Sequence, residues 1–149
     1  MKRVYLAASF AYTDKEQTKK RCEAIDEVVT TLKLKGLDVY VPHEMEIPNA
    51  WDYTMQEWGL MVFSRDVAEI DKSDLVVMLS WGKENNAGAA WEVGYAFAKG
   101  KKVVVVAMNE ALQSLMVLHG SYAQVKHENL FDYDFDTMPK SREITGVES

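Results

Sequence analysis

The sequence predicts an α/β fold in which a doubly wound parallel sheet of five strands carries helices on both faces. Short runs rich in β-branched residues alternate with longer segments whose apolar residues recur at three- and four-residue spacing. Strands that alternate with helices are joined by right-handed crossovers and form a parallel sheet. The length of 149 residues and the apolar fraction of 48% suit a globular domain with a full core. We therefore expect residues 1–149 to form a single domain.

Four strands are predicted from β-branched runs, and the clearest covers residues 102–107. Residues 103–106 are all valine, which is typical of a strand that is buried on both faces. The other three strands are expected at residues 3–8, 37–41 and 75–79. The stretch from Ala123 onward is expected to add a fifth strand.

Helices are expected between these strands, at residues 14–35, 51–71, 87–99 and 109–119. In the first of them Ile25, Val28 and Leu32 recur at helical spacing, and Gly36 follows as a stop signal. Gly100 ends the third helix in the same way. Residues 141–149 are expected to be a loose tail.

The predicted topology also predicts where a ligand binds. In a flavodoxin-like sheet of order 2-1-3-4-5, ligands bind beyond the carboxyl ends of the strands, at the switch point between the first and third strands. The loops there are residues 8–12 and 80–88, and the second loop leads into the helix that carries Glu92. The fold prediction alone therefore places Glu92 near the expected ligand site.

Composition excludes several classes of partner. A net charge of −6 and a pI near 5.1 argue against a nucleic acid or an anionic membrane as partner, because both require clustered Lys and Arg. The single cysteine, Cys22, permits no internal disulfide and fits a reducing compartment. No apolar run approaches the roughly 20 residues of a membrane span, and the N-terminus lacks the apolar core of a signal peptide. We expect a cytoplasmic protein.

Common cofactor and metal motifs are also missing from the sequence. Residues 7–11 (AASFA) follow the first strand without a glycine, whereas a dinucleotide fold requires G-x-G-x-x-G there. There is no P-loop, and the positions where a phosphoacceptor domain needs acids hold residues 8–9 (AS) and 80–81 (SW). His43, His119 and His127 have no ligand neighbours at metal-binding spacing. We therefore expect neither a cofactor nor a metal.

Glu92 is the first candidate for chemistry, because it is the only acid in a run of small and apolar residues, 87–94 (AGAAWEVG). We expect it in the first turn of its helix, where backbone N–H groups and the helix dipole keep a carboxylate ionised, as a nucleophile requires. Gly88 would let a ligand approach the helix end. A second interpretation stays open at this point, in which Glu92 only completes a capping box.

Asp66 is the second candidate, because it falls within an apolar stripe, four residues after Val62 and four before Ile70. A charge there is costly unless it is paired or functional, and a salt bridge with Arg65 is the structural alternative. Two carboxylates that converge on one cleft are typical of chemistry at a glycosidic bond. Phe10, Tyr12 and Trp58 are candidates for an aromatic wall of that cleft.

These residues resemble those of a known family, the nucleoside 2-deoxyribosyltransferases. The matching segments are 4–9 (VYLAAS), Trp58 with 63–66 (FSRD) and Ile70, 88–96 (GAAWEVGYA), 114–116 (SLM) and 132–135 (DYDF). They lie in the order and spacing of the family over most of residues 3–138. The combination of the G-x-x-aromatic-E-apolar-G block with the upstream aspartate makes the resemblance specific.

The resemblance implies an activity and a role for each matching residue. Glu92 would be the nucleophile that takes the 2-deoxyribosyl group from one nucleobase and delivers it to another, Tyr5 would orient Glu92, and Asp66 would bind the base and shuttle its proton. Substrates would be 2′-deoxynucleosides and free nucleobases, and a homo-oligomer would complete each site across subunits. The implied substrate-binding positions are Phe10, Trp58, Glu46, Asn86, Gly88, Ser114 and Met116.

Three of these positions depart from the common pattern of the family. Asn86 stands where most members have an Asp that holds the sugar hydroxyls, Glu46 stands where a Gln commonly contacts the base, and Ser114 replaces a common Asn. A Ser at that last position resembles the related deoxynucleoside 5′-monophosphate N-glycosidases, but residues 9–14 (SFAYTD) lack the Gly- and Arg-rich phosphate loop of those hydrolases. Hydrolysis of 2′-deoxynucleosides or their 5′-monophosphates is the first alternative function. A non-catalytic nucleoside sensor is the second.

Overall fold

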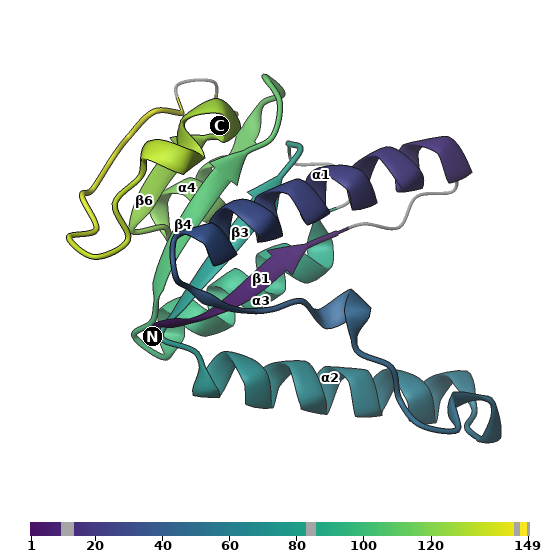
Figure 1. Cartoon of the computed structure of the whole chain (residues 1–149). Coiled ribbons are helices and arrows are strands. Elements are labelled where there is room, and N and C mark those ends of the chain that lie inside the picture. The colour runs from purple at the N-terminus through teal and green to yellow at the C-terminus, as the bar shows by residue number, and fades with distance from the viewer. Residues whose placement is uncertain (10–13, 83–85, 145–146, 149) are drawn as a thin grey trace.

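Five parallel strands form the central sheet in the order β2-β1-β3-β4-β6; β1, β3, β4 and β6 are labelled in Figure 1. The computed structural model describes residues 1–9, 14–82, 86–144 and 147–148. The strands are β1 (Arg3–Ala8), β2 (Asp38–Tyr40), β3 (Leu75–Ser80), β4 (Lys102–Ala107) and β6 (Ala123–Lys126). The α/β class and the flavodoxin-like strand order 2-1-3-4-5 are confirmed, with β6 as the fifth strand along the chain in this sheet.

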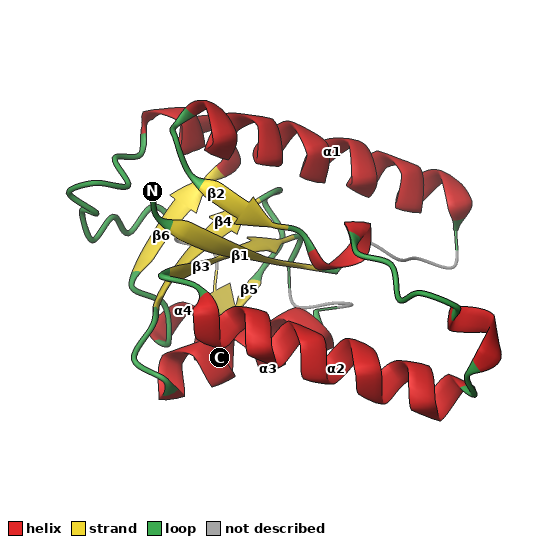
Figure 2. Ribbon diagram, turned by 60° about the horizontal axis from the view of Figure 1, so that its bottom comes forward, coloured by secondary structure: helices red, strands yellow, loops and turns green. Residues whose placement is uncertain are grey.

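Helices cover both faces of this sheet (Figure 2). Helix α1 (Lys15–Leu34) packs on one face. Helices α2 (Met55–Lys72), α3 (Ala87–Ala98) and the short α4 (Leu115–His119) lie on the other. Successive strand residues point to opposite faces, so the side chain of Leu6 joins the core under α1, whereas Tyr5 joins the core under α2 and α3.

The helix boundaries follow local capping signals. Asp14 caps α1 by accepting a hydrogen bond from the backbone N–H of Glu16, and Gly36 follows the helix with a φ of 82°, a conformation that favours glycine. Thr54 and Glu57 form a reciprocal capping box at the start of α2. This capping box explains why α2 begins at Met55, later than predicted, after the 3₁₀ turns η1 (Pro42–Glu44) and η2 (Ala50–Asp52).

Two predictions for the C-terminal part of the chain are wrong. The helix expected at 109–119 covers only Leu115–His119, because Ser114 caps it and Gln113–Ser114 form the short strand β5. The tail expected to be loose is held in several places: Arg142 forms a bridge with Gln124, and β7 (Val147–Glu148) pairs with β5. The 3₁₀ helix η3 (His127–Asp132) connects β6 to this segment.

In the parts of the chain described above, no helix combines the length and apolar character needed to cross a membrane.

Candidate active site

A cavity of about 600 Å³ lies beside the carboxyl end of β1, between α2 and α3. We call it the α2–α3 cavity. It contains both carboxylates that the sequence analysis singled out, and it lies at the predicted switch point of the sheet. Its lining residues are Ala8, Ser9, Pro42, His43, Met45, Trp58, Gly59, Val62, Phe63, Arg65, Asp66, Val67, Ile70, Gly88, Ala89, Trp91 and Glu92.

Glu92 reaches this cavity from the second turn of α3. The helix starts at Ala87 with Asn86 as its cap, and no acid lies in its first turn. The predicted first-turn position of Glu92 is therefore wrong, and so is the capping-box alternative, because Glu92 is six residues beyond the cap. The carboxylate is held instead by the hydroxyl of Tyr5, which is fully buried and donates a hydrogen bond to Oε2 of Glu92.

This environment changes the expected ionisation of Glu92. Burial raises its pKa from the ordinary 4.5 to about 7; the hydrogen bond from Tyr5 lowers it, and the charge of Asp66 raises it further. Glu92 is therefore near its midpoint at neutral pH, and the prediction that the helix start keeps it ionised is wrong. Burial, followed by the charge of Glu92, raises the pKa of Tyr5, so Tyr5 remains a neutral donor.

Asp66 lines the same cavity from α2. Arg65 holds one of its oxygens: the Arg65 Nε atom lies 3.1 Å from Oδ1 of Asp66. Burial raises the pKa of Asp66, and the positive charge of Arg65 partly opposes that shift. The salt bridge with Arg65 is therefore present, and the same carboxylate lines the cavity that contains Glu92. Its role in chemistry stays a prediction.

Aromatic side chains form much of the cavity wall. Trp58, which was predicted, lines it with 40% of its surface exposed. Two others, Phe63 and Trp91, were not predicted as wall residues; their rings pack edge to face at 5.1 Å between centroids. Trp91 also stacks on Tyr95 at 5.6 Å. Their places in the sequence could have indicated this role, because Phe63 lies one helical turn before Asp66 and Trp91 directly precedes Glu92. The predicted wall residues Phe10 and Tyr12 lie outside the described residues.

The predicted substrate contacts divide into two groups. Gly88 lines the cavity as expected. Asn86 does not, because its side chain is buried and donates to the carbonyl of Gly82 and to Oγ of Ser80. Glu46 is absent from the lining, where its neighbour Met45 is present together with His43, which the sequence analysis had not assigned to the site.

Ser114 and Met116 are separate from the cavity of their own chain. Ser114 caps α4, accepting from the backbone N–H of Val117 at 3.5 Å, and Met116 is 85% exposed. Neither residue lines the α2–α3 cavity. Their contribution to the site of a neighbouring subunit stays a prediction.

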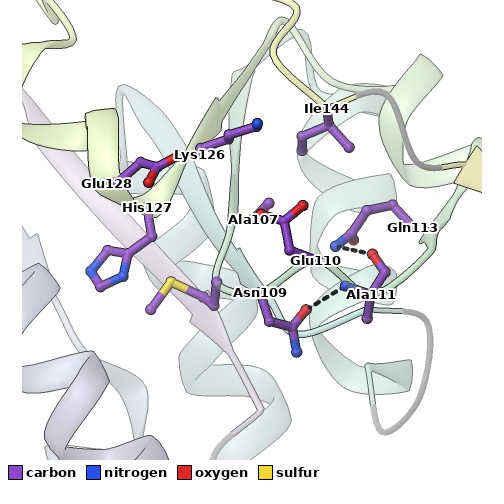
Figure 3. Close-up of a pocket in the computed structure, with 10 residues that line it drawn as sticks. Ala107, Asn109, Glu110, Ala111, Gln113, Lys126, His127, Glu128 and Ile144 are labelled. Atoms are coloured by element: carbon purple, nitrogen blue, oxygen red, sulfur yellow. Dashed lines mark hydrogen bonds between the residues drawn. The ribbon is translucent and has the colours of Figure 1, made fainter.

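A second cavity, of about 310 Å³, lies at the carboxyl ends of β4 and β6 (Figure 3). We call it the β4–β6 cavity. Lys126, His127 and Glu128 border it on one side, and the segment that contains Asn109 and Glu110 borders it on the other. Among its described lining residues there is no Phe, Tyr or Trp. Residues 1–9, 14–82, 86–144 and 147–148 also contain no group of three His, Cys, Asp or Glu side chains arranged to hold a metal ion.

The chain is similar to known proteins in both sequence and structure. The sequence model of the family "Nucleoside 2-deoxyribosyltransferase" matches residues 4–132. The chain is similar in structure to a 2-deoxyribosyltransferase from the psychrotolerant bacterium Bacillus psychrosaccharolyticus, with a TM-score of 0.80, 26% identity, and coverage of 93% of this chain and 97% of that one. It is also similar to a conserved protein from Enterococcus faecalis V583, with a TM-score of 0.51, 26% identity, and coverage of 73% and 65%.

A search of curated protein sequences found no significant match. The family match spans most of the chain, and the structural similarity covers the sheet and both helical layers. The protein belongs to the nucleoside 2-deoxyribosyltransferase family.

Proposed function

We propose that the protein transfers the 2-deoxyribosyl group of a 2′-deoxynucleoside to a free nucleobase by double displacement on Glu92. One observation carries this proposal: Glu92 and Asp66 line one aromatic-walled cavity from two different helices, and Tyr5 fixes one oxygen of Glu92. A nucleophilic carboxylate with a second carboxyl group for proton transfer is the arrangement that retaining chemistry at a glycosidic bond requires.

In the first displacement, a carboxylate oxygen of Glu92 attacks C1′ of the nucleoside and forms a glycosyl ester. The C1′–N bond breaks, its electron pair leaves with the base, and Asp66 supplies the proton that the departing base takes. In the second, a nitrogen of the incoming base attacks C1′ and the ester bond to Glu92 breaks. Asp66 then accepts the proton that the new base loses, so the enzyme returns to its starting state.

The reaction sets a requirement on the ionisation of both acids, since the first step needs Glu92 ionised and Asp66 protonated. Burial raises the pKa of both groups, the hydrogen bond from Tyr5 favours the ionised form of Glu92, and the positive charge of Arg65 favours the ionised form of Asp66. The rate of transfer should therefore depend on pH through both groups.

The aromatic wall supports transfer over hydrolysis. Trp58, Phe63 and Trp91 present apolar surface to the cavity, and such a wall gives a planar base a stacking surface and limits the water that reaches the glycosyl ester. Transfer should therefore dominate when free base is present, with slow release of 2-deoxyribose in its absence.

Incubation of the purified protein with 2′-deoxyinosine, with and without adenine, separates the three candidate functions. Formation of 2′-deoxyadenosine and hypoxanthine is the expected result. Release of 2-deoxyribose that exceeds transfer even at saturating adenine would establish the hydrolase alternative. Binding of the nucleoside without formation of any product would support the alternative of a non-catalytic nucleoside sensor.

Association between subunits is part of the proposal, because Ser114 and Met116 lie outside the cavity of their own chain. A methionine that is 85% exposed next to the apolar residues of α4 suits a contact with a second copy. We expect sedimentation to give a homo-oligomer, and Met116→Asp to weaken association and activity together. A fully active monomer at assay concentration would refute the shared site.

A further inference from the structure

Arg65 joins Asp66 to the segment that forms one edge of the α2–α3 cavity. Its Nη1 donates to the carbonyl of Met45 at 2.8 Å, and its Nη2 donates to the carbonyl of Pro42 at 3.1 Å. Its Nε and Nη2 both lie 3.1 Å from Oδ1 of Asp66. One guanidinium group therefore fixes an acid of the site and two points on the cavity wall.

These contacts make the two oxygens of Asp66 unequal. Both nitrogens of Arg65 that approach the carboxylate lie on Oδ1, and in the described parts of the chain Oδ2 receives no hydrogen bond. A carboxyl group takes up its proton more readily on the oxygen that does not already accept from a cation. Oδ2 is therefore the oxygen that can exchange a proton with a ligand.

We propose that Arg65 is a positioning residue that reserves Oδ2 of Asp66 for proton exchange with the nucleobase and holds the Pro42–Met45 edge of the cavity at a fixed distance from it. This inference rests on the proposed function, since it assigns a partner to the acid that the reaction uses. The fork geometry of the guanidinium is essential to it, because a lysine provides a single charged nitrogen and cannot span three acceptors.

Other charged and titratable groups face Asp66 from each neighbouring element. Arg65 and Glu69 lie on its own helix, Tyr5 lies on β1, Tyr40 lies on β2, and Glu92 lies on α3. His43, on the segment that Arg65 anchors, also lines the cavity. Arg65 is the cation that opposes protonation of Asp66, so its removal should raise the pKa of Asp66.

The test is a double-mutant cycle of Arg65→Gln and Asp66→Asn, read first by calorimetric binding of adenine, which requires no turnover. If Arg65 acts through Asp66, Arg65→Gln weakens adenine binding in the native background and has a much smaller effect when Asp66 is already Asn. Non-additivity of this kind is the signature of coupled residues. Equal losses in both backgrounds would show that Arg65 only supports the fold, and would overturn the inference.

Kinetics supply the second readout. Arg65→Gln should lower kcat/KM for transfer by roughly 10- to 100-fold, as expected when a catalytic group is misplaced, and should shift the alkaline limb of the pH profile to higher pH. Arg65→Lys should lower the rate while it leaves the pH profile in place, because it keeps the charge and loses the fork. An unchanged rate and profile in Arg65→Gln would contradict the assignment.

Arg142→Gln is the matched control. Arg142 also anchors a chain segment, because its Nη1 donates to the backbone carbonyl of Tyr122 at 2.6 Å. It lies outside the α2–α3 cavity, so its loss should leave adenine binding and the pH profile unchanged.

A failure of the proposed function can be told apart from a failure of this inference. If the wild type binds adenine and transfers nothing, the proposed function is wrong, and the binding cycle still decides the role of Arg65.

Discussion

The two cavities lie at the carboxyl edge of one sheet and differ in what surrounds their charges. In the α2–α3 cavity, Asp66 and Glu92 lie against Trp58, Phe63 and Trp91. In the β4–β6 cavity, Glu110 and Glu128 are exposed to solvent and accompany Lys126. Burial raises the pKa of the first pair.

The difference shows how the surroundings of a carboxylate change its ionisation. Glu92 is enclosed by apolar residues and accepts a hydrogen bond from Tyr5, so the free energy of its charge depends on the protein. An exposed glutamate, by contrast, is solvated by water. The charge of a side chain alone is therefore a poor guide to a site, whereas charge together with an apolar enclosure is a better one.

Glu92→Ala should give the largest effect, a loss of several orders of magnitude in 2-deoxyribosyl transfer, because a covalent nucleophile acts as a unit with its supporting groups. Glu110→Ala, in the β4–β6 cavity, is the paired control and should retain the wild-type rate. Initial rates of 2′-deoxyadenosine formation, with circular dichroism to check folding, make the comparison. Near-native turnover in folded Glu92→Ala would remove the proposed mechanism.

Asp66→Asn should give the second largest effect. Loss of a general acid–base group typically lowers a rate by about 10²- to 10⁴-fold, and an amide cannot deliver the proton that the leaving base needs. Single-turnover rates with 2′-deoxyinosine measure the first displacement directly. If Asp66→Asn weakens only the binding of substrate and leaves the rate of the chemical step unchanged, another group delivers the proton to the leaving base.

Tyr5→Phe should have a smaller effect that depends on pH. The hydroxyl of Tyr5 lowers the pKa of Glu92, so its removal raises that pKa further and leaves less of the ionised nucleophile at neutral pH. We expect a loss on the order of tenfold near pH 7, comparable to the free energy of one hydrogen bond to a charged group, and partial recovery above pH 8. A loss that is the same at every pH would show that Tyr5 does not act through the ionisation of Glu92.

Glu92→Gln should keep the fold and change how the stability of the protein depends on pH. The pKa of Glu92 is about 7 in the folded chain against an ordinary 4.5, so the folded chain binds this proton more tightly than the unfolded chain does. The wild type therefore loses stability as pH rises from about 4.5 through 7, by at most about 3 kcal/mol. Thermal unfolding should show equal stability of the two proteins near pH 4 and a more stable Gln variant at pH 8. A stability difference that does not change with pH would argue against the buried charge.

The fold was largely predictable because its determinants are local. The four valines of β4, the stop at Gly36 and the apolar periodicity of α1 each depend on neighbours in sequence, and each is found where predicted. The helix expected at 109–119 failed for the opposite reason, because β5 in that region pairs with the distant strand β7 and the helix begins only after the cap at Ser114.

The two acids of the candidate site were predictable from the sequence, whereas the residues that surround and hold them were less predictable. Asp66 stood out because a charge occupied an apolar stripe, and Glu92 stood out among small residues. The start of α3 at Ala87 was predicted, but the hydrogen bonds that hold Asn86 were not, because they reach back to Ser80 at the end of β3 and to Gly82 in the following loop. The bonds from Arg65 to Pro42 and Met45 link segments about 20 residues apart, and no local pattern in the sequence indicates them.

The most direct test of the central claim is to identify the atom that carries the sugar. A 2′-deoxynucleoside analogue with fluorine at C2′ should form the glycosyl ester and slow its release, because the electronegative substituent destabilises an oxocarbenium-like transition state. Intact-mass spectrometry should show one added fluorodeoxyribosyl group per chain, and peptide sequencing should place it on Glu92, with no adduct in Glu92→Ala. An adduct on Asp66 or on any residue outside the α2–α3 cavity would contradict the account.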